Sequence, residues 1–345
     1  MHQKFIILGI FLFILGIFGL FAQKPELFWG VDMSAVFDNR EGDTQHAQAK
    51  TFFQTQLAPE IGLSLNNDSH RIAAGVVWTQ PIGSEWEGYR LSPTVYYRYQ
   101  SKGLRFAMGM FGRNQLYADM PNYIWNDSVK YSQRNIRGAM IAYRNEKGYV
   151  QAFLDWRGMQ THSQREAFNI IASGERGYAL GKFFWGGLIM LNHLAKDKTH
   201  NPDQYVVDNI LYNPYIGIDI AKIAVNNPLD SCSFRIGALG GLSRDRSDME
   251  WKTPVGLWAD LDVAWKFLEL ENTFYAGGKL FPLYGKFTYI LDQGEPYYAA
   301  SLYNRTSVSV VFLKRSFMSL KASLDFNIAP SHFNFYQRVI LSFSI

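Results

Sequence analysis

The chain contains 345 residues, of which 48% are hydrophobic, 19% charged and 16% aromatic. Its formal net charge is +4, and loss of an N-terminal segment carrying Lys4 leaves 33 basic and 30 acidic residues, or +3. So weak a basic balance does not argue for nucleic-acid binding, which usually needs clustered Lys and Arg. The composition is too polar for a helical-bundle membrane protein and too aromatic for a typical soluble domain. The 29 Gly and 20 Tyr favour twisted strands with aromatic girdles.

The N-terminal residues form the first recognisable segment. Met1–Lys4 is positively charged, the next seventeen residues form an uncharged apolar run, and Ala22 offers a small residue at a cleavage point. This pattern is typical of a secretory signal peptide, which we predict over residues 1–22. An uncleaved anchor helix is the alternative, because the apolar run is slightly long and Leu20 is bulky where a small residue is preferred. The only cysteine, Cys232, cannot form an internal disulfide, which is compatible with an exported protein.

The rest of the chain alternates apolar and polar residues in segments of roughly ten. Beyond the leader there is no uncharged apolar run of about 18 residues, the length that a spanning helix needs. Apolar side chains occupy every second position of segment 319–328 without exception, and segments 256–267 and 52–65 repeat the pattern. Only helices and closed barrels satisfy their backbone groups in lipid, so this chain must enter a membrane as a barrel if it enters one.

The turns between these segments alternate in length. Short turns are expected at 66–68, 101–103, 146–148 and 314–315, and longer ones at 38–50, 81–89, 114–130, 196–205 and 244–251. Up-and-down barrels in outer membranes show this alternation, with short periplasmic turns and longer outer loops. We therefore predict an all-β fold, a transmembrane up-and-down antiparallel β-barrel of about 14 to 16 strands. It forms one domain over residues 23–345.

The last segment alternates to the final residue. Val339, Leu341, Phe343 and Ile345 alternate with Arg338, Ile340, Ser342 and Ser344. The chain here resembles porin-like bacterial outer-membrane β-barrels, whose final strand has alternating hydrophobic residues and an aromatic or apolar end. Ile345 departs from that pattern, since Phe or Trp is commoner there. The resemblance covers residues 23–345 as a pattern. It implies a bacterial outer-membrane location, contact with outer-membrane lipid, and recognition of the last strand by the barrel-assembly machinery.

Charged side chains of both signs face the interior if the apolar faces contact lipid. The pore-lining candidates are Arg98, Arg105, Arg157, Arg235, Asp260, Asp262, Glu271 and Asp325. Opposed rows of charge would orient dipolar solutes, and rings of charge set ion preference. The alternative is that these charges pair and plug a sealed barrel. Strand number bears on this choice, because barrels of about 16 strands leave a channel whereas small barrels are filled by side chains.

The segment 114–130 is unusually apolar for a solvent-exposed loop. Tyr117, Tyr123 and Trp125 are the candidates for a constriction loop folded into the barrel. An external rim that binds a partner and an outer aromatic girdle are the alternatives. The segment 279–298 is a second candidate with the same alternatives.

A hydrolase is the enzymatic alternative, since some outer-membrane barrels are hydrolases. Outer-membrane phospholipases and lipid A deacylases place a catalytic His two residues before a Ser, so that His activates Ser. Ser does not occupy that position after any of these histidines: His46, His70, His162, His193, His200 and His332. Zinc-binding spacings such as His-x-x-x-His are also absent. We therefore expect no enzyme activity, no catalytic residue, no metal and no cofactor.

These features together predict a porin-like channel for the passive diffusion of small hydrophilic solutes. A non-conducting scaffold for surface polysaccharide assembly or export is one alternative, and a barrel-embedded hydrolase is another. The expected partners are membrane lipid and the assembly machinery, with no nucleic acid. The sequence leaves self-association and solute identity open.

Overall fold

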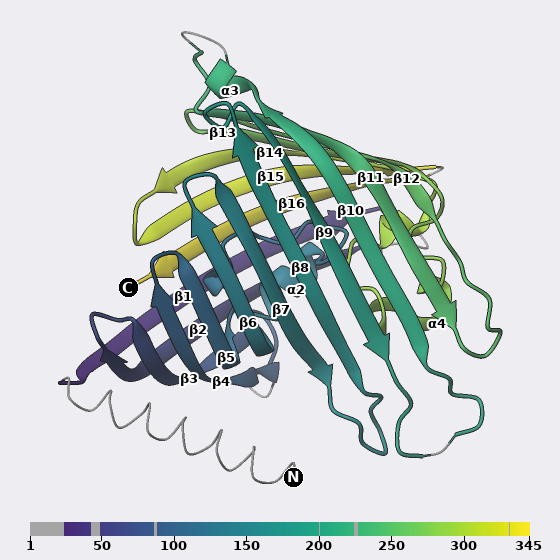
Figure 1. Cartoon of the computed structure of the whole chain (residues 1–345), viewed down its shortest axis with the longest axis horizontal. Coiled ribbons are helices and arrows are strands. Elements are labelled where there is room, and N and C mark those ends of the chain that lie inside the picture. Colours follow the sequence, from purple (N-terminus) through teal and green to yellow (C-terminus); the bar gives the residue numbers. More distant parts are fainter. Residues whose placement is uncertain (1–23, 43–48, 86–87, 200, 224–226, 331) are drawn as a thin grey trace, which may run out of the picture.

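The computed structural model describes residues 24–42, 49–85, 88–199, 201–223, 227–330 and 332–345, so the predicted signal peptide lies outside the described residues. In this part of the chain, sixteen antiparallel strands close into one barrel. Each strand pairs with its neighbours in sequence, and the ring closes between the first strand and the last (Figure 1). The prediction of an up-and-down β-barrel is confirmed, with a strand number at the upper end of the expected range.

The strands are long enough to cross a bilayer when tilted. They are β1 (Glu26–Glu41), β2 (Lys50–Leu65), β3 (His70–Pro81), β4 (Arg90–Ser101), β5 (Leu104–Gly112), β6 (Asn135–Asn145), β7 (Gly148–Gly158), β8 (Ala167–Tyr178), β9 (Phe183–Leu194), β10 (Val207–Asp219), β11 (Ser231–Asp245), β12 (Val255–Trp265), β13 (Leu268–Gly277), β14 (Leu302–Lys314), β15 (Met318–Ala329) and β16 (His332–Ser344). The helical segments are η2 (Arg113–Gln115), α2 (Asp127–Ser132), α3 (Ile220–Ile223), α4 (Tyr284–Phe287), η3 (Thr288–Ile290) and η4 (Pro296–Ala299). Among the described residues, no helix has the length and apolarity to span a membrane.

The outer face of the barrel is apolar because successive side chains of a strand point to opposite sides. Large aliphatic side chains are exposed around this face, including Ile61, Ile72, Met108, Ile141, Val150, Ile189, Leu257 and Leu324. Exposed aromatic side chains lie nearer the strand ends, including Trp29, Tyr143, Tyr178, Trp185, Trp265 and Phe267 at one end and Phe37, Phe53, Trp156 and Phe333 at the other. An apolar band between two aromatic girdles is the exterior of an outer-membrane barrel.

The ring is closed at the C-terminus of the chain. The β1–β16 register runs from Asp32↔Ser344 to Glu41↔Phe335. Beyond it, the backbone N–H of Val31 donates to the carbonyl of Ile345 at 3.0 Å, and the N–H of Ile345 donates back at 3.1 Å. The predicted last strand therefore supplies the edge that seals the barrel.

Connections at the two ends of the barrel differ in length. At the end of the barrel where β1 begins, successive strands are joined by tight turns. One of them is Asn66–Asp68, whose three residues have positive φ angles of 54°, 50° and 62°. The connection with α3 between β10 and β11 is the exception at this end, which we call the turn end. The opposite, loop end has the longer connections, apart from the short one between β15 and β16. The short turns mark the periplasmic side.

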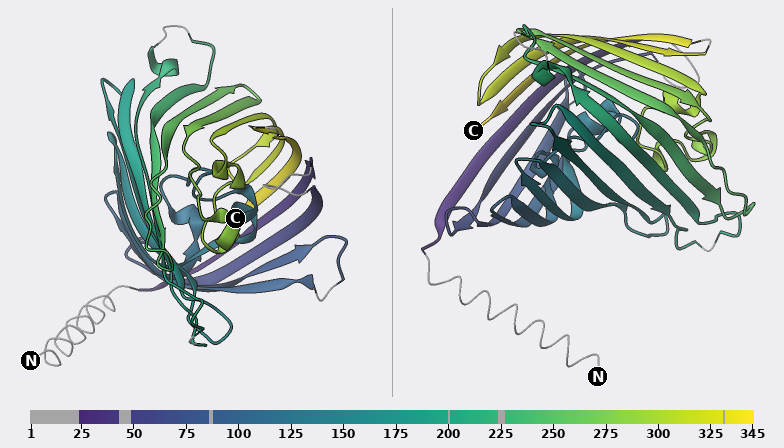
Figure 2. Two further views of the ribbon diagram at one scale, coloured as in Figure 1. Left: turned by 90° about the vertical axis from the view of Figure 1, so that its right-hand side faces the viewer. Right: turned by 45° about the horizontal axis from the view of Figure 1, so that its top comes forward.

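Two loop-end connections fold into the barrel instead of outwards. One, the first inward loop, covers residues 113–134 and contains η2 and α2; the other, the second inward loop, covers residues 278–301 and contains α4, η3 and η4. Figure 2 (left) shows both inside the ring of strands. Their aromatic side chains are buried, with Tyr123 exposed by 1% and Tyr297 by 0%. Both apolar segments therefore lie inside the barrel and not at an outer rim or girdle, and their role as a constriction stays a prediction.

Candidate functional site: the lumen

Lumen-facing charges of opposite sign occupy opposite walls of the barrel. Arg98, Arg105 and Arg157 lie on β4, β5 and β7, whereas Asp260 and Asp262 lie on β12. In the closed ring of sixteen, β4, β5 and β7 lie eight, seven and five positions from β12, so Arg98 lies on the wall opposite the two aspartates and Arg157 lies farther round the ring. Their action on a solute remains a prediction.

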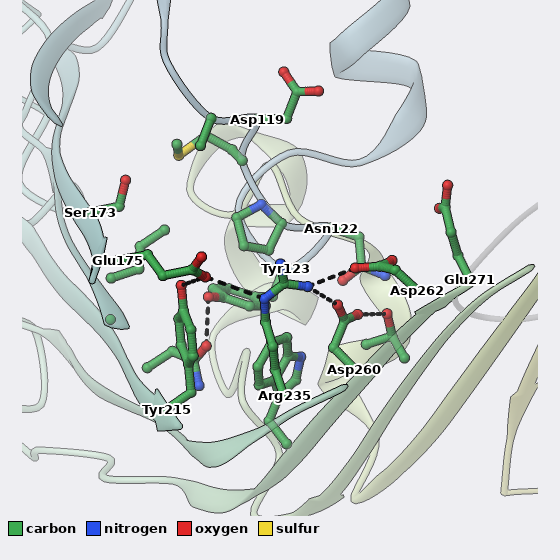
Figure 3. Close-up of a pocket in the computed structure, with 18 of the residues that line it drawn as sticks. Asp119, Asn122, Tyr123, Ser173, Glu175, Tyr215, Arg235, Asp260, Asp262 and Glu271 are labelled. Carbon is green, nitrogen blue, oxygen red and sulfur yellow. Dashed lines mark hydrogen bonds and ion pairs between the residues drawn. The ribbon is translucent and has the colours of Figure 1, made fainter. Parts of the chain in front are cut away.

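The acidic wall carries one arginine among several carboxylates. Arg235 Nη1 lies 2.6 Å from an oxygen of Asp262 and 3.3 Å from one of Asp260, and its Nε lies 3.5 Å from Glu175. Figure 3 shows the guanidinium between Glu175 on one side and the two aspartates on the other. Tyr215 donates to Glu175 at 3.1 Å and Thr273 donates to Asp260 at 2.8 Å, which fixes both carboxylates. One cation therefore serves three anions, and the cluster is net negative.

These residues line a cavity of about 480 Å³ in the lumen. Its walls include five acidic residues and three basic ones, namely Asp119, Glu175, Asp260, Asp262 and Glu271 against Lys130, Arg235 and Arg305. The side chains of Asp262 and Glu271 are exposed by 42% and 54%, so they present charge to the cavity. An acidic, water-accessible compartment attracts cations and disfavours anions.

Aromatic side chains form the side of the cavity next to the first inward loop. Tyr123 donates to the side-chain oxygen of Asn213 on β10 at 2.9 Å, which ties the loop to the wall. Its ring packs edge-on against Trp258, with centroids 6.1 Å apart, and Trp258 in turn lies 5.9 Å from Tyr215. Rigid aromatic faces beside carboxylates are surfaces on which polyhydroxylated or cationic solutes can stack.

A buried cluster of four charges anchors the first inward loop, and we call it the ionic latch: Asp127, Arg305, Asp325 and Arg338. Asp127, in the first turn of α2, pairs with Arg305 at 2.9 Å and with Arg338. Asp325 accepts from the same two arginines. Burial opposes ionisation of Asp127, but the guanidiniums of Arg305 and Arg338 hold its pKa well below the usual range. The latch is neutral as a whole and joins α2 to β14, β15 and β16.

The second inward loop is anchored to the opposite part of the wall. The carbonyl of Leu291 accepts from Arg157 at 3.4 Å and also from Asn192. Asn209 donates to Asp292 at 2.7 Å. Burial raises the pKa of Asp292 to about 7, although the Asn209 hydrogen bond and the charge of Arg157 act in the other direction. This loop is therefore held by a carboxyl group that titrates near neutral pH.

The remaining candidates occupy more crowded surroundings than an open pore. Arg98 pairs with Asp68 in a periplasmic turn, and Arg105 donates to the carbonyl of Gln115 at 2.5 Å while lying 4.6 Å from the ring centroid of Tyr117. Both arginines line a smaller cavity of about 260 Å³ near the turn end. The expectation that Asp325 borders open lumen is wrong, because its side chain is 0% exposed inside the latch.

Trp125 anchors the first inward loop through packing. Its ring lies 3.8 Å from the guanidinium carbon of Arg113 and 5.6 Å from the ring of Phe153, measured to the centroids. Tyr117 lies between Arg105 and Arg144 and donates to the carbonyl of Gly103. All three aromatic candidates of this loop therefore contact the inner wall.

Several residues of the site were not among the sequence candidates. Glu175 is followed by an outward-facing Arg176 and preceded by Gly174, so the alternation that marks lumen-facing positions is broken around it. Arg305 lies between Asn304 and Thr306, which face outwards and accept hydrogen bonds from Asn272. Because these outward positions are polar, β14 does not show the alternation of apolar and polar residues around Arg305. Only the strand registers reveal the inward direction of these charges.

The fold and exterior define the class of protein: a porin-like β-barrel of the bacterial outer membrane. The chain belongs to the lipid A 3'-O-deacylase-type family, whose family model matches residues 21–345. A comparison with curated protein sequences gives no significant match.

Solved structures show the same architecture at very low sequence identity. The crystal structure of OpdK from Pseudomonas aeruginosa with vanillate has a TM-score of 0.54 and 9% identity over 93% of this chain and 98% of that one. OccK2 (OpdF) of the same species, in complex with glucuronate, has a TM-score of 0.51 and 8% identity over 93% and 98%. OprB from Pseudomonas putida has a TM-score of 0.54 and 8% identity over 92% and 94%. At 8–9% identity these structural similarities show a shared fold alone.

Membership of the family corrects one expectation from the sequence. The chain was expected not to be an enzyme, but the family that matches it is described as a deacylase. The expectation rested on the absence of a local His-x-Ser spacing. That spacing tests only for groups on one strand face, whereas catalytic groups are often assembled from distant parts of a chain. In the described residues, no group of three or more His, Cys, Asp and Glu side chains has the geometry to hold a metal ion.

Proposed function

We propose that this protein is a narrow outer-membrane channel for small hydrophilic solutes. The observation that carries the proposal is the cavity of about 480 Å³ between the first inward loop and the acidic wall. It is lined by charged, hydroxyl and aromatic groups in a barrel whose strand number leaves room for a channel. The two inward loops narrow the lumen, so passage is limited to small molecules.

The charge of the cavity favours cations and neutral polyols over anions. Arg235 is shared by Glu175, Asp260 and Asp262, so its positive charge is already compensated. Asp262 and Glu271 stay partly exposed to the cavity, although Asp262 pairs with Arg235 and Glu271 lies 3.6 Å from Lys321. Acidic rings select cations in the same way in other pores.

The test is single-channel recording of the purified mature chain in planar bilayers under a salt gradient. We expect stepwise conductance and a reversal potential that shows cation preference. Asp262→Asn should reduce this preference, because it removes an exposed carboxylate from the cavity. Asp203→Asn is the matched control, since Asp203 is exposed in the connection between β9 and β10 and does not line the cavity. A folded barrel without conductance would refute the channel and favour a scaffold.

Deacylation of lipid A is a second candidate, supported by the family match over residues 21–345. The test is incubation of the folded barrel with purified lipid A, followed by mass spectrometry of the lipid. Loss of one acyl chain would support hydrolysis. Intact lipid A, with a heat-unfolded sample as the reference, would refute it for this chain. The two assays are independent, so each function can fail separately.

A further inference from the structure

The outer wall carries a groove at the turn end that the lumenal function does not use. We define this outer-wall groove by Tyr143, Val150, Gly174, Trp185 and Gly187, and its volume is about 470 Å³. These residues come from four adjacent strands, β6 to β9. Outward-facing residues dominate its surface, so the groove opens towards lipid.

The strand register explains why the wall is hollowed here. Val150 pairs with Gly174, and Gly174 pairs with Gly187 on the next strand. Two glycines therefore lie side by side on the outer wall, whereas the apolar band around them carries large side chains. Tyr143 stands at one side of this row, opposite Val150, and Trp185 stands near the other side. The absence of two side chains between aromatic walls produces a slot as wide as two strands, or about 10 Å.

Positive charge lies at the turn end of the groove. Arg176 faces outwards one row nearer the turn than Gly174, paired with Gly148 and Trp185, and Lys147 lies in the adjoining turn. The guanidinium carbon of Arg176 lies 6.0 Å from the ring centroid of Tyr178, within the aromatic girdle. Girdles of this kind lie at the level of lipid headgroups.

The neighbouring acid does not neutralise this charge. Glu175 contributes to the groove surface, but its carboxylate pairs with Arg235 and accepts from Tyr215 on the lumenal side. Among the described residues no ion pair involves Arg176, and the nearest acid in the adjoining turn is Glu146, which is exposed beside Lys147. Arg176 therefore presents its guanidinium beside an apolar slot at the boundary of the membrane. This combination matches one molecule: a lipid with an acyl chain for the slot and an anionic headgroup for the cations.

We propose that the outer-wall groove binds an anionic phospholipid of the periplasmic leaflet. One acyl chain lies over Gly174 and Gly187 between Tyr143 and Trp185. The phosphate contacts Arg176 and Lys147. A long-lived lipid at this position would fill the hollow in the wall and preserve the apolar band.

The test is native mass spectrometry of the full mature barrel, released from detergent and titrated with phosphatidylglycerol. Arg176→Gln removes the phosphate contact. Gly187→Val fills the slot; a Cβ at Gly187 would lie 3.3 Å from its nearest neighbour, the backbone carbonyl of Asn213, so that carbonyl has to shift by a few tenths of an ångström. We expect each variant to weaken the tightest lipid adduct about tenfold, the effect of one lost charge-assisted hydrogen bond or a comparable loss of packing.

Two matched controls make the same chemical changes elsewhere on the outer wall. Arg315→Gln removes an exposed arginine from another turn, and Ala139→Val adds bulk to β6 outside the groove. We expect both to bind phosphatidylglycerol as the wild type does. Heat-modified migration in gels verifies that every variant is folded, and Arg176→Gln still tests the proposal if Gly187→Val fails to fold.

Three results would overturn the proposal. The first is equal affinity in wild type, Arg176→Gln and controls. The second is equally tight binding of soluble glycerophosphoglycerol, which would make the site a phosphate site without an acyl slot. The third is a dimer of barrels that Gly187→Val disrupts in the absence of lipid.

Discussion

Replacing Asp127 by Asn removes one charge from the ionic latch and should release the first inward loop. The wild-type latch has two carboxylates and two guanidiniums, so it is neutral. Asp127→Asn leaves Asp325 as the only carboxylate of the latch that pairs with Arg305 and Arg338, with Glu295 of the second inward loop as the next anion. The exposed fractions of the side chains of Asp127, Arg305 and Arg338 are 9%, 11% and 4%, so the unpaired positive charge stays buried.

The expected cost is about 3–5 kcal/mol, the typical effect of removing one partner from a buried ion pair. This cost falls on the docked state of the loop, because Asp127 belongs to α2 while its partners belong to the wall. Salt screens a buried charge much less than a surface charge, so added salt does not remove the repulsion between Arg305 and Arg338. The undocked loop therefore becomes populated, and the lumen widens.

Single-channel recording and hydrogen exchange measure the two consequences. We expect a larger and less steady conductance for Asp127→Asn, together with faster amide exchange across residues 113–134. Asp203→Asn is the control, because it makes the same chemical change at an exposed acid outside both the loop and the cavity and should cost about 0–1 kcal/mol. If a folded Asp127→Asn barrel matches Asp203→Asn in conductance and exchange, the latch does not hold the loop and the reasoning is refuted.

Three further changes test other parts of the structure. Burial raises the pKa of Asp292 to about 7, so its docking contribution is complete below about pH 4 and is lost as the pH rises through 7, by about 4 kcal/mol. The protection factors of residues 278–301, which are corrected for the base-catalysed intrinsic exchange rate, should therefore be lower at pH 8 than at pH 5. Asp292→Asn should abolish that difference in protection. Trp125→Ala should cost about 3–5 kcal/mol and lower the heat-modification temperature, whereas an unchanged temperature would contradict its packing role. Gly103→Ala should cost about 1–3 kcal/mol, because φ is +83° and a Cβ would lie 2.1 Å from the carbonyl of Arg144; urea unfolding in detergent measures this.

The fold followed from local pattern because each strand of a membrane barrel has lipid on one side. Segment 319–328 shows this most clearly, since its apolar positions are the outward positions of β15. The turns at Asn66–Asp68 and Lys102–Gly103 also lie where their residue types indicated. Lumen-facing positions are less regular, because a plugged interior accepts aromatic and aliphatic side chains beside charges. Ile171 and Leu239, both 0% exposed, face inward for this reason.

The sequence by itself determined the compartment, the closed all-β architecture and the short turns, and it singled out two unusually apolar loop segments without deciding where they lie. These properties depend on period-2 alternation and turn chemistry, which are local. Tertiary structure alone decided that Asp127 meets Arg305 and Arg338, that Arg235 serves three carboxylates, and that Gly174 and Gly187 adjoin on the outer wall. Those contacts join residues up to 211 positions apart, from Asp127 to Arg338. They depend on register and on the closure of the ring, and no local pattern encodes either.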